Sequence, residues 1–188
     1  QSGVPAVAIN YPRSVHFGGL YTAGAWSWIF SSVAEDIAKD LKIKMERGGD
    51  FVVSLTPRSE QGAAPQPSPN ARKIKVGVFE DQRPDKRRIG ERTAAFGVGM
   101  GEVHLNRPVA TVLREALADD LLYAGYRIVD TGEDSRTHGA VSKFWVRTDT
   151  TSLYWDIVGE IELSLVVEPV TPGVEPMRKT YACRAVER

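Results

Sequence analysis

The sequence has few of the residues that build disulfides and metal sites. Its 188 residues include one cysteine, Cys183, and three histidines. A single thiol excludes an internal disulfide framework and supplies too few ligands for a zinc cluster. No apolar run approaches the ~20 residues that a membrane-spanning helix needs. Lys and Arg total 24, as do Asp and Glu, so no excess charge indicates nucleic acid or an anionic membrane as a partner.

Motifs for catalysis are also missing from the sequence. The histidines (His16, His104 and His138) are scattered near glycines or loops, and we expect them to be solvated. No serine has a G-x-S-x-G setting. The glycine-rich residues 96–101 lack the spacing of a phosphate-binding loop, so a flexible loop is predicted there. The sequence therefore predicts no cofactor, no metal site and no enzymatic activity.

An α/β unit is predicted over residues 73–130. Residues 73–79 have the pattern of a strand, and residues 80–85 interrupt it. A helix is expected over about 107–124, with Asn106 as its N-cap, Pro108 in its first turn and Gly125 as its terminator. Residues 125–130 are predicted to form a second strand.

The last third of the chain is predicted to be a sheet. Residues 157–167 alternate apolar and polar side chains, which is typical of a strand with one buried face. Residues 141–148 and 179–186 are expected to pair beside it as an antiparallel meander. The predicted fold class is therefore α/β (α+β), a mainly antiparallel mixed sheet with one or two helices packed on one face.

Before this unit, a separate segment and a linker are predicted. An apolar stripe (Ile29, Val33, Ile37, Leu41, Met45) predicts a helix over about 29–47, followed by Gly48-Gly49 and a strand at 51–53. We predict three parts: residues 1–56, a flexible Pro- and Ala-rich linker over 57–72, and a domain over 73–188. The order helix, glycine, strand recurs at 107–130. A degenerate repeat explains this, but such patterns are also common in unrelated segments.

Two groups of side chains are candidates for contacts with partners. The first comprises aromatic residues in a glycine-rich stretch, which either cover the sheet or form an interface: Phe17, Tyr21, Trp26, Trp28 and Phe30. The second is basic and either contacts an anionic partner or forms a solvated loop neutralised by nearby acids: Arg83, Arg87, Arg88 and Arg92.

A family resemblance adds to these observations. Residues 76–83 read V-G-V-F-E-D-x-R, and Ile89-Gly90, the helix at 109–121, Gly125-Tyr126 and the paired strands to Val167 follow. This pattern resembles the YajG-type family of bacterial lipoproteins. More loosely, it is similar to the amino-terminal domain of TolB and to CsgG-type secretion lipoproteins.

The resemblance implies a periplasmic protein anchored to the outer membrane by an acylated cysteine before Gln1. It also implies a non-enzymatic scaffold or accessory role in an envelope assembly, with self-association. Family members continue into a further helix after the last strand, and we expect the helix at 29–47 to take that place, in its own chain or a neighbour's. The alternative is a small-ligand binder or enzyme that uses the 81–105 loop, with Arg83, Arg88 and His104 as its polar groups.

Overall fold

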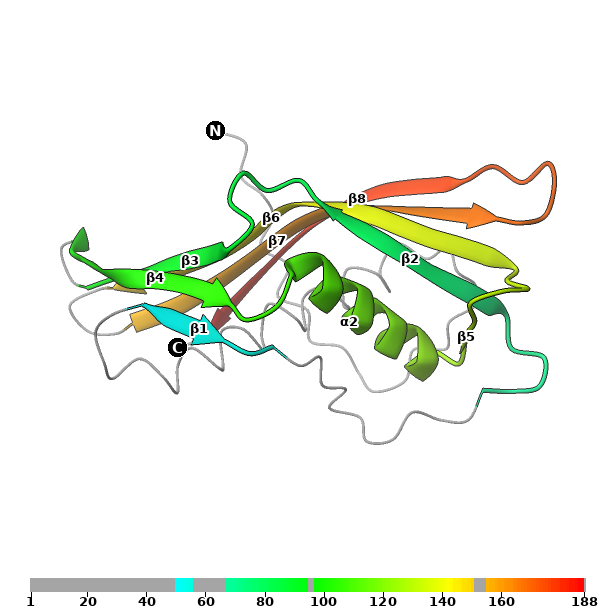
Figure 1. The fold of residues 1–188 in the computed structure, drawn as a ribbon, viewed down its shortest axis with the longest axis horizontal. Helices are drawn as coiled ribbons and strands as arrows, with labels where there is room; N and C mark the ends of the chain where they lie inside the picture. The colour runs from blue at the N-terminus through cyan, green and yellow to red at the C-terminus, as the bar shows by residue number, and fades with distance from the viewer. Residues whose placement is uncertain (1–49, 56–66, 95–96, 151–154, 188) are drawn as a thin grey trace.

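The computed structural model describes residues 50–55, 67–94, 97–150 and 155–187. Eight strands and one helix are assigned in these residues. Along the chain they are β1 (Phe51–Val53), β2 (Lys73–Asp81), β3 (Arg88–Thr93), β4 (Gly99–Leu105), α2 (Val109–Tyr123), β5 (Arg127–Ile128), β6 (Ser135–Thr150), β7 (Trp155–Pro169) and β8 (Met177–Glu187). Together they form the predicted α+β fold, a mixed sheet with one helix (Figure 1).

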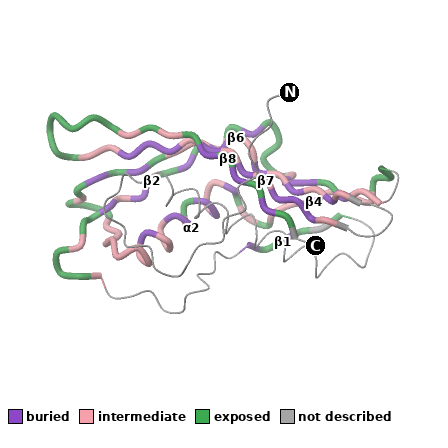
Figure 2. Tube along the Cα trace, turned by 180° about the vertical axis from the view of Figure 1, so that it is seen from behind, coloured by how far each residue is buried: buried purple, intermediate pink, exposed green. Residues whose placement is uncertain are grey.

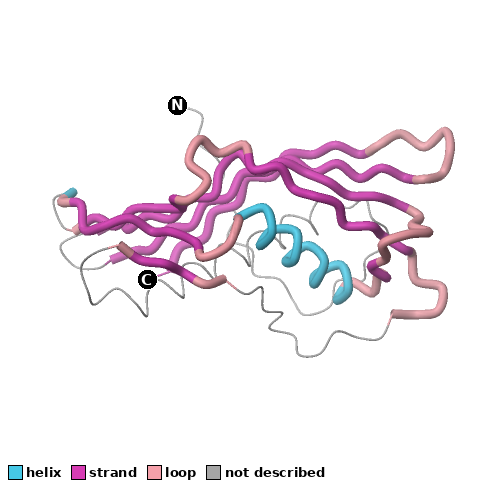
Figure 3. The backbone as a smooth tube through the Cα atoms, in the orientation of Figure 1, coloured by secondary structure: helices cyan, strands magenta, loops and turns pink. Residues whose placement is uncertain are grey.

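The long strand β6 organises the sheet. On one edge it pairs antiparallel with β7, from Ser135↔Pro169 to Thr150↔Trp155, and β7 pairs antiparallel with β8. The predicted meander is therefore confirmed, and Figure 3 shows how these strands run the length of the molecule. The β6–β7–β8 meander forms because each strand alternates buried and more exposed side chains with a period of two.

The other edge of β6 is shared by two strands that run parallel to it. β2 follows the first part of β6, from Ile74↔Ser135 to Asp81↔Val141. β3 follows a later part, where Gly90 pairs with Val146. The sheet therefore branches here: β5 continues it beside β2, and β4 and then β1 continue it beside β3.

Helix α2 packs its apolar stripe mainly against β2 and β5. All four predicted face residues are buried: Val109, Leu113, Leu117 and Leu121. Gly125 ends the helix with φ of 85°, a conformation that glycine adopts without steric cost. The prediction of Asn106 as the N-cap is wrong, because Pro108 holds the cap position and the Asn106 amide donates to the Val53 carbonyl.

The segment predicted as a loop at 81–105 is largely a β-hairpin. β3 and β4 pair antiparallel, and their Ile89 and Val103 side chains are fully buried. The prediction of a flexible loop at 96–101 is therefore wrong for residues 99–101, which begin β4. The strand predicted at 125–130 is shorter, since β5 covers only Arg127–Ile128.

One apolar core joins the helix to the inner face of the sheet. Its largest fully buried side chains include Phe144, Ile74, Leu113 and Leu163. Figure 2 shows the alternation of buried and exposed positions along the strands. In the described part of the chain, no helix is long and apolar enough to cross a membrane.

Candidate functional site: a polar hollow on the outer sheet face

The candidate site lies where the chain leaves and rejoins the edge of β6. β2 ends beside Val141, and the Gln82 amide donates to the Val141 carbonyl at 2.9 Å. β3 begins to pair only at Val146. Residues 82–87, which we call the excursion, project from the sheet between these points. No described strand pairs with residues 142–145 on this edge, so their surroundings differ from those of an ordinary central strand.

Arg83 holds the excursion closed. Its guanidinium donates to both carboxylate oxygens of Asp81, with Nε–Oδ1 at 3.0 Å and Nη2–Oδ2 at 2.9 Å. It also donates to the carbonyls of Lys86 and Arg88, both at 3.0 Å. Burial opposes ionisation of Asp81, but the hydrogen bonds from Arg83 outweigh it and hold the pKa of this carboxyl below its usual value. The Arg83 side chain therefore connects the start of the excursion, at Asp81, with its end, at Lys86 and Arg88.

Asp85 fixes the second half of the excursion. One carboxylate oxygen accepts the backbone N–H groups of Arg87 at 2.9 Å and Arg88 at 3.1 Å. These backbone hydrogen bonds lower the pKa of Asp85. Asp85 thus ends the loop and starts β3, which is a common use of aspartate in turns.

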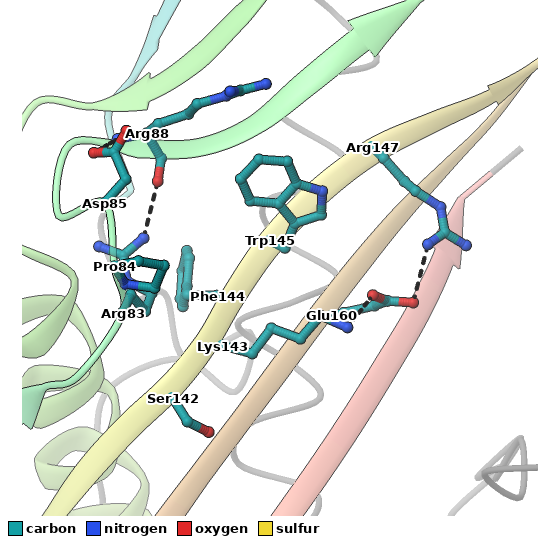
Figure 4. Close-up of a pocket in the computed structure, with 10 residues that line it drawn as sticks. All are labelled: Arg83, Pro84, Asp85, Arg88, Ser142, Lys143, Phe144, Trp145, Arg147 and Glu160. Atoms are coloured by element: carbon teal, nitrogen blue, oxygen red, sulfur yellow. Dashed lines mark hydrogen bonds and ion pairs between the residues drawn. The ribbon is translucent and has the colours of Figure 1, made fainter. Parts of the chain in front are cut away.

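Beside the excursion, the outer face of the sheet is hollowed over a volume of about 400 Å³ (Figure 4). Trp145 projects from β6 into this region, and the Arg88 guanidinium carbon lies 5.1 Å from its ring centroid, within cation–π range. The residues that line the hollow are Arg83, Pro84, Asp85, Arg88, Ser142, Lys143, Phe144, Trp145, Arg147 and Glu160.

Glu160 connects the hollow to the outer strands. Its carboxylate lies 2.8 Å from Lys143, 3.3 Å from Arg147 and 3.8 Å from Arg184. Burial raises the pKa of Glu160, but the hydrogen bond and charge of Lys143 and the charges of both arginines lower it below its usual value overall. A belt of paired charges thus crosses β6, β7 and β8.

The cations of the hollow already contact carboxylates of the same chain. Arg88 lies 2.6 Å from Glu91 and 3.4 Å from Glu102. The Arg147 guanidinium donates hydrogen bonds to the Asp149 carboxylate, and these bonds, together with nearby negative charge, raise the pKa of Arg147. An anionic ligand in the hollow would have to compete with these ion pairs.

The structure separates the predicted basic group rather than gathering it. Arg83 and Arg92 are buried, with 5% and 2% exposure, and burial lowers the pKa of Arg92. Arg87 is exposed and Arg88 is half-buried. Contact of these four arginines with an anionic partner stays a prediction. Of the four, Arg87 and Arg88 have side chains that such a partner could reach. The predicted aromatic interface residues lie outside the described residues: Phe17, Tyr21, Trp26, Trp28 and Phe30.

His104 and Arg88 are neighbours across the β3–β4 ladder, and each lies 3.4 Å from Glu102. Arg83, Arg88 and His104 are the predicted polar groups of a ligand site. Arg83 and Arg88 line the hollow, and His104 does not. Within the described ranges, no group of three or more His, Cys, Asp or Glu side chains is placed to hold a metal ion. A ligand-binding role for the 81–105 segment stays a prediction.

Sequence analysis did not select Lys143, Arg147 or Glu160 as site residues. The one indication of them in the sequence is that they lie at alternate positions of β6 and β7, which face outward from the sheet. Only the register places Trp145 opposite Glu160. Without the register, these side chains cannot be assigned to one site.

Comparisons with known proteins give no family. No protein-family model matches the chain, and no curated protein matches it. Among solved structures, protein XCC0632 from Xanthomonas campestris, described with the family model DUF330, is similar with a TM-score of 0.45 and 13% identity; the match covers 72% of this chain and 78% of that one. An uncharacterized protein matches with a TM-score of 0.43, 13% identity and coverage of 74% and 80%.

A third solved structure is the lipoprotein GNA1162 from Neisseria meningitidis. Its TM-score is 0.38 at 14% identity, and the match covers 61% of this chain and 83% of that one. Identities and TM-scores at this level assign neither a family nor a function to the chain.

Proposed function

We propose that this chain is a non-enzymatic periplasmic lipoprotein domain, anchored to the outer membrane, that serves as a scaffold or accessory subunit of a cell-envelope assembly and self-associates. The anchor and the location are implied by the family resemblance described above. The self-association is supported by one feature of the sheet, the outer edge of β8.

β8 is a long edge strand with an accessible outer side. It spans Met177–Glu187 and pairs with β7 without a shift in register, from Val167↔Met177 to Ile157↔Glu187. Within the described residues no second strand pairs with it. Edge strands of soluble proteins are usually shortened, bulged or interrupted by proline, because free N–H and C=O groups recruit further strands.

β8 has none of those three features. Its central positions 180–183 hold no charged side chain and no proline, and Ala182 is exposed. An antiparallel strand from a second copy would find backbone hydrogen bonds along the length of β8. Positions 180–183 are uncharged, and Arg178, Lys179, Arg184 and Glu187 lie on either side of them. This accessible edge is the observation on which the proposed assembly rests.

The test is the mass of the full chain under native conditions at micromolar concentration. We expect a defined oligomer by light scattering, shifted toward monomer by Ala182→Lys, since a lysine at the edge opposes strand pairing. Thr131→Lys adds the same charge at an exposed turn away from β8 and should leave the mass unchanged.

A monomer at these concentrations would contradict self-association. A stable oligomer that Ala182→Lys and Thr131→Lys affect equally would retain assembly but exclude the β8 edge as its interface.

A further inference from the structure

Beside the hollow, every second side chain of β6 points to the outer face of the sheet. Lys143, Trp145 and Arg147 are partly exposed, whereas Phe144 and Val146 between them are buried. Strand side chains alternate between the two faces, so the three partly exposed side chains form one row, which we call the outer row. The indole of Trp145 lies at its centre, with a cation on each side along the strand.

The pairing with β7 places carboxylates opposite the outer row. Glu160 pairs with Trp145, and Glu162 pairs with Lys143. Directly opposite residues of neighbouring strands have their side chains on the same face. Trp145, Arg147 and Glu160 therefore line the hollow together (Figure 4).

The charged groups around Trp145 neutralise one another. Lys143 lies 2.8 Å from Glu160 and 3.8 Å from Glu162. Arg147 donates to the two Asp149 oxygens at 3.0 Å and 3.3 Å, and to Glu160 at 3.3 Å. This group of side chains has no excess of positive charge that would attract an anion. An apolar ligand does not suit it either, because such a ligand would remove water from ionised groups.

These side chains keep hydrogen-bonding capacity after the ion pairs are made. A guanidinium has five N–H donors, and the described hydrogen bonds of Arg147 use three of its nitrogens once each. A carboxylate has about four acceptor sites, and Lys143 and Arg147 each approach one oxygen of Glu160. The Ser142 hydroxyl donates to the Glu162 carbonyl at 3.3 Å and keeps its own lone pairs. Donors and acceptors held in place by ion pairs thus lie beside the indole.

Trp145 supplies an apolar surface among these polar groups. The Arg88 guanidinium carbon lies 5.1 Å from its ring centroid, and Arg88 is itself paired with Glu91 and Glu102. The cation–π contact helps to fix the orientation of the ring. The hollow of about 400 Å³ has the size of a small-molecule site.

We propose that Trp145, Arg147 and Glu160 bind a neutral oligosaccharide on the outer face of the sheet. A sugar ring has C–H groups on its faces, which pack on an indole, and hydroxyls around its edge. Each hydroxyl both donates and accepts, so it can bond to the remaining N–H groups of Arg147 and to the Glu160 carboxylate. This role goes beyond the proposed scaffold function and does not depend on self-association. Every side chain of the site is described, whereas the helix predicted at about 29–47 lies outside the described residues.

The test measures the binding of neutral tetrasaccharides to the full chain. Cellotetraose, chitotetraose and maltotetraose are offered separately at millimolar concentration, and saturation-transfer NMR detects their contact with the protein. We expect at least one of the three to bind. Absence of binding by all of them would overturn the proposal.

A substitution of the indole tests the location of the bound sugar. Trp145→Ala should raise the Kd at least about tenfold, because a tryptophan at the centre of a binding surface supplies a large share of the affinity. Trp145→Phe keeps a ring and should lose less. Val78→Ala is the control, because this exposed valine of β2 does not line the hollow, and its Kd should not change. Equal effects of Trp145→Ala and Val78→Ala would overturn the proposed site.

Charge distinguishes a neutral sugar from an anion. Added NaCl should leave the Kd of the neutral tetrasaccharide unchanged, because salt screens interactions between charges. Glu160→Gln should weaken neutral binding severalfold, since a charged acceptor makes the stronger hydrogen bond. The same substitution should strengthen any binding of acidic oligogalacturonate. If the unaltered protein binds oligogalacturonate more tightly than the neutral sugars, and high salt abolishes this binding, the hollow is an anion site and the proposal is wrong.

Discussion

At the scale of single residues, Arg83 performs a task that its neighbours in the basic segment do not. It is nearly fully buried, and its fork of donors reaches one carboxylate and two carbonyls across the excursion. The ring centroid of Phe144 lies 6.0 Å from its guanidinium carbon. Sequence analysis treated the arginines of this segment as one group. The structure shows that the Arg83 side chain joins the two ends of the loop, whereas the Arg87 side chain is exposed.

We expect Arg83→Lys to lower the free energy of unfolding by about 2–3 kcal/mol, because an ammonium group cannot donate to both Asp81 oxygens and both carbonyls at once. Arg87→Lys, four positions further along, should change it by less than about 0.5 kcal/mol. Urea denaturation of both variants provides the measurement. Equal losses would show that Arg83 has no special part in closing the loop.

At the scale of elements, the contact between β3 and β6 depends on a very close approach of two backbones. A Cβ atom added to Gly90 would lie 2.1 Å from the Val146 carbonyl oxygen. β3 must therefore carry glycine where it meets β6. Since, among the described strands, β4 and β1 join the sheet through β3, this position supports that whole branch.

Gly90→Ala is expected to destabilise the protein by about 1–3 kcal/mol, the usual cost of forcing extra volume into a packed site. Gly99→Ala on β4 is the matched control, because an added Cβ there meets no atom within 4 Å. Thermal unfolding followed by circular dichroism distinguishes the two variants. A Gly90→Ala protein as stable as the control would contradict this close approach.

The sequence predicted much of the fold where a single periodicity dominates. The alternation over residues 157–167 identified β7, and the stripe from Val109 to Leu121 identified α2. It failed where charges interrupt the pattern. β3 reads R-I-G-E-R-T, and its buried residues are Ile89, Gly90 and Arg92. Arginine is usually exposed, so a strand that buries one has no clear alternation of apolar residues.

The hollow could not be predicted, because its residues meet through register. Arg88 approaches Trp145 only because β3 joins β6 after the excursion, and Glu160 lies beside Lys143 and Arg147 only because of the β6–β7 pairing. Such contacts join residues that are distant in sequence. Local propensity contains no information about them.

At the scale of the whole molecule, the branched edge of β6 has a consequence for the order of folding. The β6–β7–β8 meander joins strands that are adjacent in sequence, whereas β2 and β3 pair with β6 across the full length of the intervening helix and hairpin. Closing long loops costs more entropy before contacts repay it, so the meander should form first and act as a template. In refolding with pulsed hydrogen exchange, amides of residues 135–187 should gain protection before those of β1 and β2. Simultaneous protection would mean that the two halves of the sheet form in one step.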